Sequence, residues 1–238
     1  MCVRAAGAAS VLALAILFVP CVASAATTVR IEVAGLGNID VELYDSTPLT
    51  TANFLHYVTD GRYDNSFIHR SIPGFVIQGG GYYWSGPATF DYIPDYDIIL
   101  LNEADLSRSN LMRTIAMAKV GGDPDSATSQ WFFNLADNGG VPPDGLDYQN
   151  GGFTTFGQVV AGWDVVLAIA GLTVRDGSSI YSDFGDLPLM DTFTGPPQPL
   201  YVSDFVNITQ VTVLPEPATL ALVAVGGLAL ARRRGRKQ

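Results

Sequence analysis

The chain contains 238 residues, of which 48% are hydrophobic and 15% are charged, and its formal net charge at pH 7 is −10. This length is sufficient for one domain with a sizeable hydrophobic core. An acidic chain repels the phosphate backbone of nucleic acids, so the charge excludes nucleic acid as a partner.

The first 25 residues contain the three parts of a secretory signal peptide. Arg4 lies in a short basic region, residues 11–19 form an apolar run, and the small residues Ala23-Ser24-Ala25 follow. This order and length predict a signal peptide over residues 1–25, which signal peptidase removes after Ala25. A short buried helix is the structural alternative.

Both cysteines of the chain, Cys2 and Cys21, lie inside this predicted signal peptide. Lipidation at Cys21 is an alternative that Pro20 disfavours, because a small residue is needed just before a lipidated cysteine. After cleavage the protein has no cysteine, which excludes disulfides, thiol catalysis and cysteine–metal sites in the mature chain.

Local patterns after the signal peptide predict short strands and two helices. Apolar and polar residues alternate over residues 29–33 and 39–43, and the glycines between them predict a β-hairpin. Helical spacing of apolar residues predicts a helix over residues 50–59 and another over 163–170. A continuous apolar stretch covers residues 72–77, and short buried strands are expected at residues 114–120, 130–135, 153–160 and 206–213.

Two long polar stretches interrupt these elements. Residues 82–97 are rich in Tyr and Asp, residues 178–199 are rich in Pro, Asp and Gly, and we expect both to be surface loops. Both are long for structureless connections, so they are either functional or inserted. Two helices among many short strands favour a closed or nearly closed β-architecture whose ends are covered by helices.

Residues 67–80 form the segment richest in chemistry, with the sequence FIHRSIPGFVIQGG. It places one permanent cation, Arg70, and one amide, Gln78, among apolar and aromatic side chains. Together the two polar groups could grip a peptide backbone while Phe75 and Val76 line an apolar pocket. The structural alternative is a core strand whose arginine extends to the surface.

This segment resembles the cyclophilin signature F-H-R-x-x-x-G-F-x-x-Q-G-G and departs from it only at Ile68, where phenylalanine is usual. Residues 115–118 and 126–134 resemble the central strands of the same family. Residues 146–147 and 151–159 resemble the bacterial form of its closing segment. The blocks occur in the family order, so the resemblance implies a mainly β domain over residues 26–214, a closed eight-stranded antiparallel barrel capped by two helices.

The resemblance also implies an activity, peptidyl-prolyl cis–trans isomerisation. Rotation about an Xaa–Pro bond is slow because amide resonance gives a barrier of about 18–20 kcal/mol. Near the top of the barrier the lone pair of the prolyl nitrogen localises, and a cation that donates a hydrogen bond to it stabilises the twisted amide. Arginine suits this role because its charge is permanent and its donors form a rigid fork.

Site residues are carried over from the family position by position. Arg70 matches the catalytic arginine, and Gln78 and Gln130 match glutamines that hold the arginine or the substrate backbone. The remaining matched positions line the proline pocket or the peptide groove. The expected catalytic residues are Arg70, Phe75 and Gln78, and the expected substrate-binding residues are Val76, Ala118, Lys119, Gln130, Phe132, Leu146 and Phe153.

Three departures from the family pattern affect this transfer. Gly145 stands where many eukaryotic members have tryptophan, and Phe153 replaces a pocket histidine. Lys119-Val120 replaces the usual asparagine–alanine pair, which makes the rim of the groove bulkier and more basic. We therefore expect the site to be retained with an altered specificity.

The last 24 residues, 215–238, resemble the PEP-CTERM sorting signal. Pro215-Glu216-Pro217 precedes an apolar run over residues 218–231, and an arginine-rich end follows. The resemblance implies an exported protein of a Gram-negative bacterium, anchored transiently in the inner membrane by a short helix and cut by an exosortase. A plain C-terminal membrane anchor is the alternative, although the run is short for a span of about 20 residues.

Removal of both ends changes the charge balance, because they carry 6 of the 13 basic and 1 of the 23 acidic residues. The remaining domain has 7 basic and 22 acidic residues and a formal charge of −15. We expect it to act without a cofactor or metal, as a monomer, on polypeptides that contain Xaa–Pro. The alternatives are a non-catalytic module that binds proline peptides and a passive component of the cell surface or matrix.

Few other residues suggest chemistry. His56 is expected on the surface of the first helix or half buried, and His69 is expected to be structural. The acidic groups around residues 91–97 and 123–125 do not have the spacing of a calcium loop, and we expect them in solvated loops.

Overall fold

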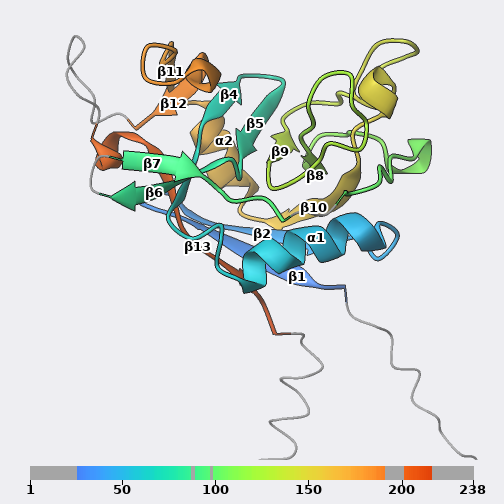
Figure 1. Ribbon diagram of the computed structural model, residues 1–238, viewed down its shortest axis with the longest axis horizontal. Coiled ribbons are helices and arrows are strands. Elements are labelled where there is room, and N and C mark those ends of the chain that lie inside the picture. Colours follow the sequence, from blue (N-terminus) through green and yellow to red (C-terminus); the bar gives the residue numbers. More distant parts are fainter. Residues whose placement is uncertain (1–25, 87–88, 97–98, 191–200, 216–238) are drawn as a thin grey trace, which may run out of the picture.

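The computed structural model describes residues 26–86, 89–96, 99–190 and 201–215. The predicted signal peptide and the apolar run of the tail lie outside the described residues. Two α-helices, α1 (Pro48–Thr59) and α2 (Trp163–Ala170), accompany thirteen strands in this part of the chain (Figure 1). The strands are β1 Thr28–Val33, β2 Gly37–Leu43, β3 Ser66–Ile68, β4 Arg70–Ile72, β5 Val76–Gly79, β6 Tyr82–Gly86, β7 Thr89–Tyr92, β8 Thr114–Met117, β9 Trp131–Asn134, β10 Thr155–Ala161, β11 Thr173–Arg175, β12 Leu187–Leu189 and β13 Val206–Val213.

Eleven of these strands form one curled antiparallel sheet in the order β4-β5-β9-β8-β10-β2-β1-β13-β3-β6-β7. Only His69 separates β3 from β4, so one stretch of chain pairs with β13 on one side and with β5 on the other. When β3 and β4 are counted as one strand, the run from β4 to β3 contains eight strands, and its two ends meet in this stretch of chain. This arrangement confirms the expected mainly β cyclophilin-like architecture. The hairpin of β6 and β7 extends the sheet outside this ring.

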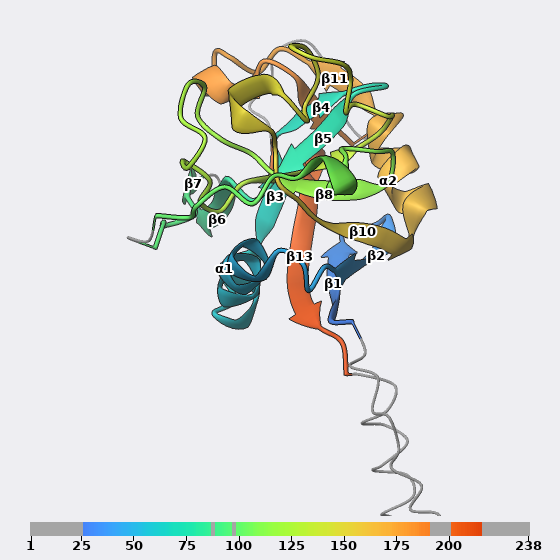
Figure 2. The same cartoon turned by 90° about the vertical axis from the view of Figure 1, so that its right-hand side faces the viewer.

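The two helices confirm the helical patterns in the sequence and lie far apart around the barrel (Figure 2). Helix α1 packs against β13, and α2 packs against β2 and β4. Pro48 begins α1, where its missing N–H costs nothing. The carboxylate of Glu103, from a distant loop, accepts hydrogen bonds from the backbone N–H groups of Leu49 (3.2 Å) and Thr50 (2.7 Å). Within the described residues no helix is long and apolar enough to cross a membrane.

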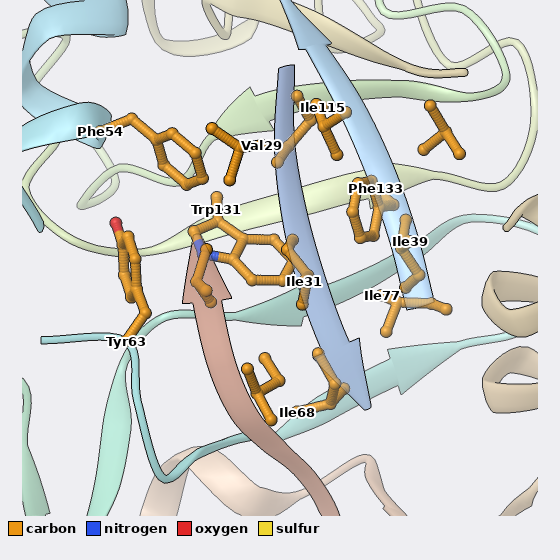
Figure 3. Packing of buried hydrophobic residues seen from close by; sticks show 14 of the residues in the cluster. Val29, Ile31, Ile39, Phe54, Tyr63, Ile68, Ile77, Ile115, Trp131 and Phe133 are labelled. Atoms are coloured by element: carbon orange, nitrogen blue, oxygen red, sulfur yellow. The ribbon is translucent and has the colours of Figure 1, made fainter. Parts of the chain in front are cut away.

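The main core fills the barrel with the inward-facing side chains of its strands. In β1 every second residue is buried, and Val29 and Ile31 are at most 1% exposed. Figure 3 shows these two residues around Trp131 of β9, with Phe54 of α1 and Tyr63 closing one end. The alternating apolar residues from which the first hairpin was predicted are therefore the residues that face the core.

The expectation of surface loops at residues 82–97 and 178–199 is wrong for much of their described parts. The first stretch contains the hairpin β6–β7, and the second contains a short 3₁₀ helix and β12. They fold because their aromatic and apolar side chains form a second core. Its buried members are Phe67, Tyr82, Phe184, Leu187, Leu189 and Phe205.

His69 occupies the break between β3 and β4 and is 2% exposed. Its backbone N–H donates to the carbonyl oxygen of Gln78 (3.2 Å), and its ring packs edge-on against Tyr82. Burial lowers the pKa of His69 to about 4, with the charge of Arg70 adding to the shift and Asp183 opposing it. The expectation of a structural histidine agrees with this placement.

The Gly79-Gly80-Gly81 run lies against Trp131 and the two residues that precede it, Ser129 and Gln130. Gly80 has φ +75°, and a Cβ there would lie 2.6 Å from the carbonyl oxygen of Ser129 and 2.7 Å from Trp131 Nε1. Both the backbone conformation and the close approach therefore require glycine at this position.

We predict that Gly80→Ala destabilises the protein more than the matched variant Gly122→Ala. Gly122 also has a positive φ (+85°), but its Cβ position is open to a distance of 4 Å. Backbone strain should cost about 1 kcal/mol in both variants, and overpacking should add roughly 2 kcal/mol at Gly80. Urea unfolding of the two variants measures the difference, and equal losses would contradict the packing argument.

His69 should make the protein less stable in mild acid. Its pKa is about 4 in the folded state and 6.5 in the unfolded chain, so the unfolded state binds the proton first as the pH falls through this window. The free energy of unfolding should therefore drop by roughly 2 kcal/mol between pH 7 and 5 on account of this group. Urea unfolding at several pH values between 7 and 5 measures this dependence. His69→Gln should flatten it, and a variant that keeps the full slope would contradict the role of this residue.

Candidate active site

The strand register places the key side chains of the sequence motif next to one another. Arg70 of β4 pairs with Gln78 of β5, Gln78 pairs with Phe132 of β9, and Phe132 pairs with Ala116 of β8. Directly paired residues share one face of a sheet, so these four side chains form a row across four strands. Their neighbours Ile77 and Phe133 point to the other face, into the main core.

Hydrogen bonds link the polar members of this site. Arg70 Nη1 donates to Gln78 Oε1 (3.3 Å), and Gln78 Nε2 donates to Gln130 Oε1 (2.8 Å). Gln130 in turn accepts the backbone N–H of Ala118 at its carbonyl oxygen (2.9 Å). The structure thus brings together the arginine and the two glutamines that the sequence motif selected.

An apolar pocket of about 260 Å³ lies beside this chain of hydrogen bonds. Val76, Phe132 and Leu146 line it, are each less than 10% exposed, and pack with Ala116 in one apolar cluster. Phe75 and Phe153 pack against them, and the ring of Phe153 meets that of Phe132 edge-on at 5.8 Å. Its volume lies just below the usual range of small-molecule sites.

All ten sequence-selected residues lie at this pocket or at a smaller one beside it. The second pocket, of about 120 Å³, shares Gln78, Ala118 and Lys119 with the first and adds Gln130. The larger pocket is lined by Arg70, Phe75, Val76, Gln78, Ala118, Lys119, Phe132, Leu146, Gln149 and Phe153. Of these, Gln149 was not expected from the sequence.

Lys119 is tied to the wall of the pocket. Its Nζ donates to the carbonyl oxygens of Asn150 (2.8 Å) and Gly152 (2.6 Å) and lies 5.0 Å from the centre of the Phe153 ring. Burial lowers its pKa to about 8, although the nearby Asp125 and Asp123 oppose the shift. The charged Lys119 side chain therefore stabilises the loop that carries Phe153.

A network of polar side chains holds the backbone of Phe75 and Phe153 at the pocket, and the sequence patterns did not reveal this network. Asp147 accepts hydrogen bonds from the backbone N–H of Asn110 (2.8 Å) and from Ser109 Oγ (2.5 Å). Asn110 Nδ2 donates to the carbonyl oxygen of Phe153 (3.0 Å), and Asn138 Nδ2 donates to that of Phe75 (2.8 Å). Asn110 and Asn138 contact backbone carbonyl groups that lie far away in the chain. Because any residue offers such a carbonyl, no local sequence pattern reveals these contacts.

Gly145 occupies a turn that has no room for a side chain. It has φ +91°, and a Cβ there would lie 2.2 Å from the carbonyl oxygen of Gly139 and 2.6 Å from Gly140 Cα. A tryptophan at this position, which the resemblance associates with eukaryotic members of the family, would require a different path of residues 139–145. This departure from the family pattern is therefore accompanied by a local backbone arrangement.

His56 and Asp125, which the sequence analysis also considered, make structural contacts. His56 stacks on Tyr96 at 3.8 Å between ring centres, and its Nε2 is 3.7 Å from the carboxylate of Asp60. Asp125 accepts the backbone N–H of Asn102 (2.8 Å) and stabilises a loop. No group of three or more His, Cys, Asp or Glu side chains within the described ranges could hold a metal ion.

Asp186 is a further neighbour of Arg70 that the sequence did not suggest. Its Oδ2 lies 3.5 Å from Arg70 Nε, and the two side chains are 46% and 35% exposed, respectively. The two residues are 116 positions apart in the chain, so only the fold brings them together.

Comparison with known proteins assigns both parts of the chain. Residues 28–184 match the family of cyclophilin type peptidyl-prolyl cis-trans isomerases, and residues 213–237 match the PEP-CTERM protein-sorting motif. The peptidyl-prolyl cis-trans isomerase of Acinetobacter baylyi is 40% identical over 136 residues, which cover 57% of this chain and 68% of the relative. Peptidyl-prolyl cis-trans isomerase B of Escherichia coli is 39% identical over 145 residues, or 59% of this chain and 84% of the relative.

The solved structures support the same fold. A cyclophilin type peptidyl-prolyl cis-trans isomerase from Cryptosporidium parvum, crystallised in the presence of the dipeptide Ala-Pro, aligns with a TM-score of 0.54. It is 20% identical in sequence, and the alignment covers 79% of this chain and 99% of that structure. The motif, the barrel and the relatives agree, and the chain belongs to the family of cyclophilin-type peptidyl-prolyl cis–trans isomerases.

Proposed function

We propose that this enzyme isomerises Xaa–Pro bonds in exported and surface proteins of a Gram-negative bacterium, outside the inner membrane. In this proposal Arg70 stabilises the twisted prolyl amide. One observation carries it, namely that Gln78 holds the Arg70 guanidinium on the wall of a pocket that is also lined by Phe75, Phe132 and Leu146.

In this proposal the pocket binds the prolyl ring, and Arg70 stabilises the transition state. The apolar walls, including Phe75, Phe132 and Leu146, would hold the prolyl ring while the residue before proline rotates. As the amide twists, its nitrogen becomes a hydrogen-bond acceptor, and Arg70 meets it with a charged donor. Because planar amides offer no such acceptor, the interaction favours the transition state over both ground states.

The surrounding polar groups would guide the rest of the peptide. Gln130 and the backbone near Ala118 line the smaller pocket next to the proline site. We propose that they bind the main chain of the substrate before the proline. Lys119, braced against Phe153, would set the width of the groove at this point.

The two ends of the barrel lie together, an arrangement that would suit a domain attached to the membrane by its tail before processing. Val29 of β1 pairs with Val213 of β13, and Leu214 N–H donates to the carbonyl oxygen of Thr28 (2.8 Å), so both ends leave the barrel side by side. Figures 1 and 2 place them on the side away from β4 and β5. A domain held in this way would keep its groove open to substrates.

We further propose the processing steps. Signal peptidase would remove residues 1–25, and an exosortase would act on the tail over residues 215–238 after it has anchored the chain in the inner membrane. The catalytic domain over residues 26–214 would then remain outside that membrane. The sorting-motif match at residues 213–237 supports this proposal.

Arg70→Ala should lower kcat/KM for Xaa–Pro peptides by about 10- to 100-fold. A hydrogen bond from a charged donor contributes about 1.5–3 kcal/mol, and each 1.4 kcal/mol changes the rate about tenfold. A protease-coupled or NMR exchange assay on a panel of Xaa–Pro peptides measures the loss. Arg70→Lys should retain part of the activity, because it keeps the charge and loses the fork.

Arg30→Ala is the matched control for this experiment. Arg30 is also 35% exposed and pairs with Asp40, but it lies on β1. Its loss should leave the rate unchanged. A wild-type protein that binds proline peptides without accelerating their isomerisation would instead support the non-catalytic binding module.

Replacement of Pro215, Glu216 and Pro217 by alanine should prevent processing of the tail. In a Gram-negative host that has an exosortase, the wild-type protein should lose its C-terminal segment, while the variant keeps it. Intact-mass measurement of the exported protein distinguishes the two forms. Arg70→Ala should be processed normally, and equal processing of all three proteins would contradict the sorting role of this segment.

A further inference from the structure

The segment after α2 folds back onto the strand that carries Arg70. It contains β11, a 3₁₀ helix at Ser182–Phe184, and β12, which pairs with β11. The backbone N–H of Ser71 in β4 donates to the carbonyl oxygen of Asp186 (2.8 Å). This hydrogen bond fixes the segment beside Arg70, near the point where the family match ends at residue 184.

Asp186 is held in place from both sides. Phe184 and Leu187 are fully buried (0% exposed) in the second core, and the backbone of Leu187 pairs with Arg175 of β11. The Asp186 side chain, by contrast, is 46% exposed and reaches Arg70 Nε at 3.5 Å. The backbone that carries this carboxylate is therefore fixed beside Arg70, although the side chain itself lies at the surface.

We propose that Asp186 is a positioning residue for the isomerase reaction. It contacts Nε of Arg70 while Gln78 accepts from Nη1, so the guanidinium is held on two sides. Among the described residues no partner is found for Nη2, which remains for the prolyl nitrogen. The inference rests on the proposed function of Arg70.

The contact has two opposing effects on catalysis. It restricts a long side chain to one orientation, which raises the fraction of enzyme that is ready to donate. Its negative charge also offsets part of the positive charge that stabilises the twisted amide. Because both side chains are partly exposed, water screens the charge effect, and the orienting effect should be the larger one.

Asp186→Ala in the full chain, purified in detergent, should therefore lower kcat for an Ala-Pro peptide about three- to tenfold. KM should stay within twofold, because the apolar pocket is untouched. Asp186→Asn should restore most of the rate, since its amide oxygen still accepts from Nε. Water exchange of the Arg70 Nε–H proton, followed by NMR, should be faster in the alanine variant than in the wild type.

Asp176→Asn is the matched control, since it removes one negative charge from the same segment. Asp176 accepts from Ser178 (2.9 Å to the backbone N–H) and does not touch Arg70. Its rate should equal that of the wild type. Should Asp186→Ala fail to fold, Asp186→Ser, whose hydroxyl is too short to reach Nε, takes its place.

An unchanged kcat in Asp186→Ala would overturn the inference, as would an asparagine variant as slow as the alanine variant. Arg70→Ala is assayed alongside to separate this result from a failure of the proposed function. If Arg70→Ala loses activity and Asp186→Ala does not, only the positioning role is wrong. If Arg70→Ala keeps full activity, the role of Arg70 itself is wrong.

Discussion

The antiparallel register of β4, β5 and β9 is the constraint on which both the core and the site depend. Arg70, Gln78 and Phe132 lie on one face of these strands, while Ile77 and Phe133 lie on the other. A slip of one residue would turn the apolar side chains out of the core and the arginine into it. The stability of the barrel core therefore enforces the geometry of the site.

Both cations of the groove are held by partners. Arg70 contacts Gln78 and Asp186, and Lys119 donates to two backbone carbonyls beside Phe153. Residues 26–214 have a formal charge of −15, and within them these two side chains supply positive charge at fixed points of the groove. An electrostatic contribution to catalysis requires such preorganisation, because a mobile charge would have to be ordered during the reaction.

The sequence predicted the parts of the fold that have a local signal. Alternating residues in β1 and β2, the apolar run of β13 and the helical spacing in α1 and α2 are short-range patterns, and the motif around Arg70 is contiguous. The hairpin β6–β7 was missed because its Tyr and Asp content is typical of loops, and its aromatic rings pack against Phe184 and Phe205, more than 90 positions away. Asp186, Asn110 and Asn138 were missed for the same reason, because their contacts are long-range and partly to backbone atoms.

The role of Arg70 can be tested in a crystal structure of this protein with a bound Ala-Pro peptide. We predict that the prolyl ring lies between Phe75, Phe132 and Leu146, with an Arg70 Nη atom within about 3.2 Å of the prolyl nitrogen. Gln78 and Asp186 should still contact the guanidinium. A proline bound outside this pocket, or an Arg70 turned away from the prolyl nitrogen while the ring occupies the pocket, would contradict it.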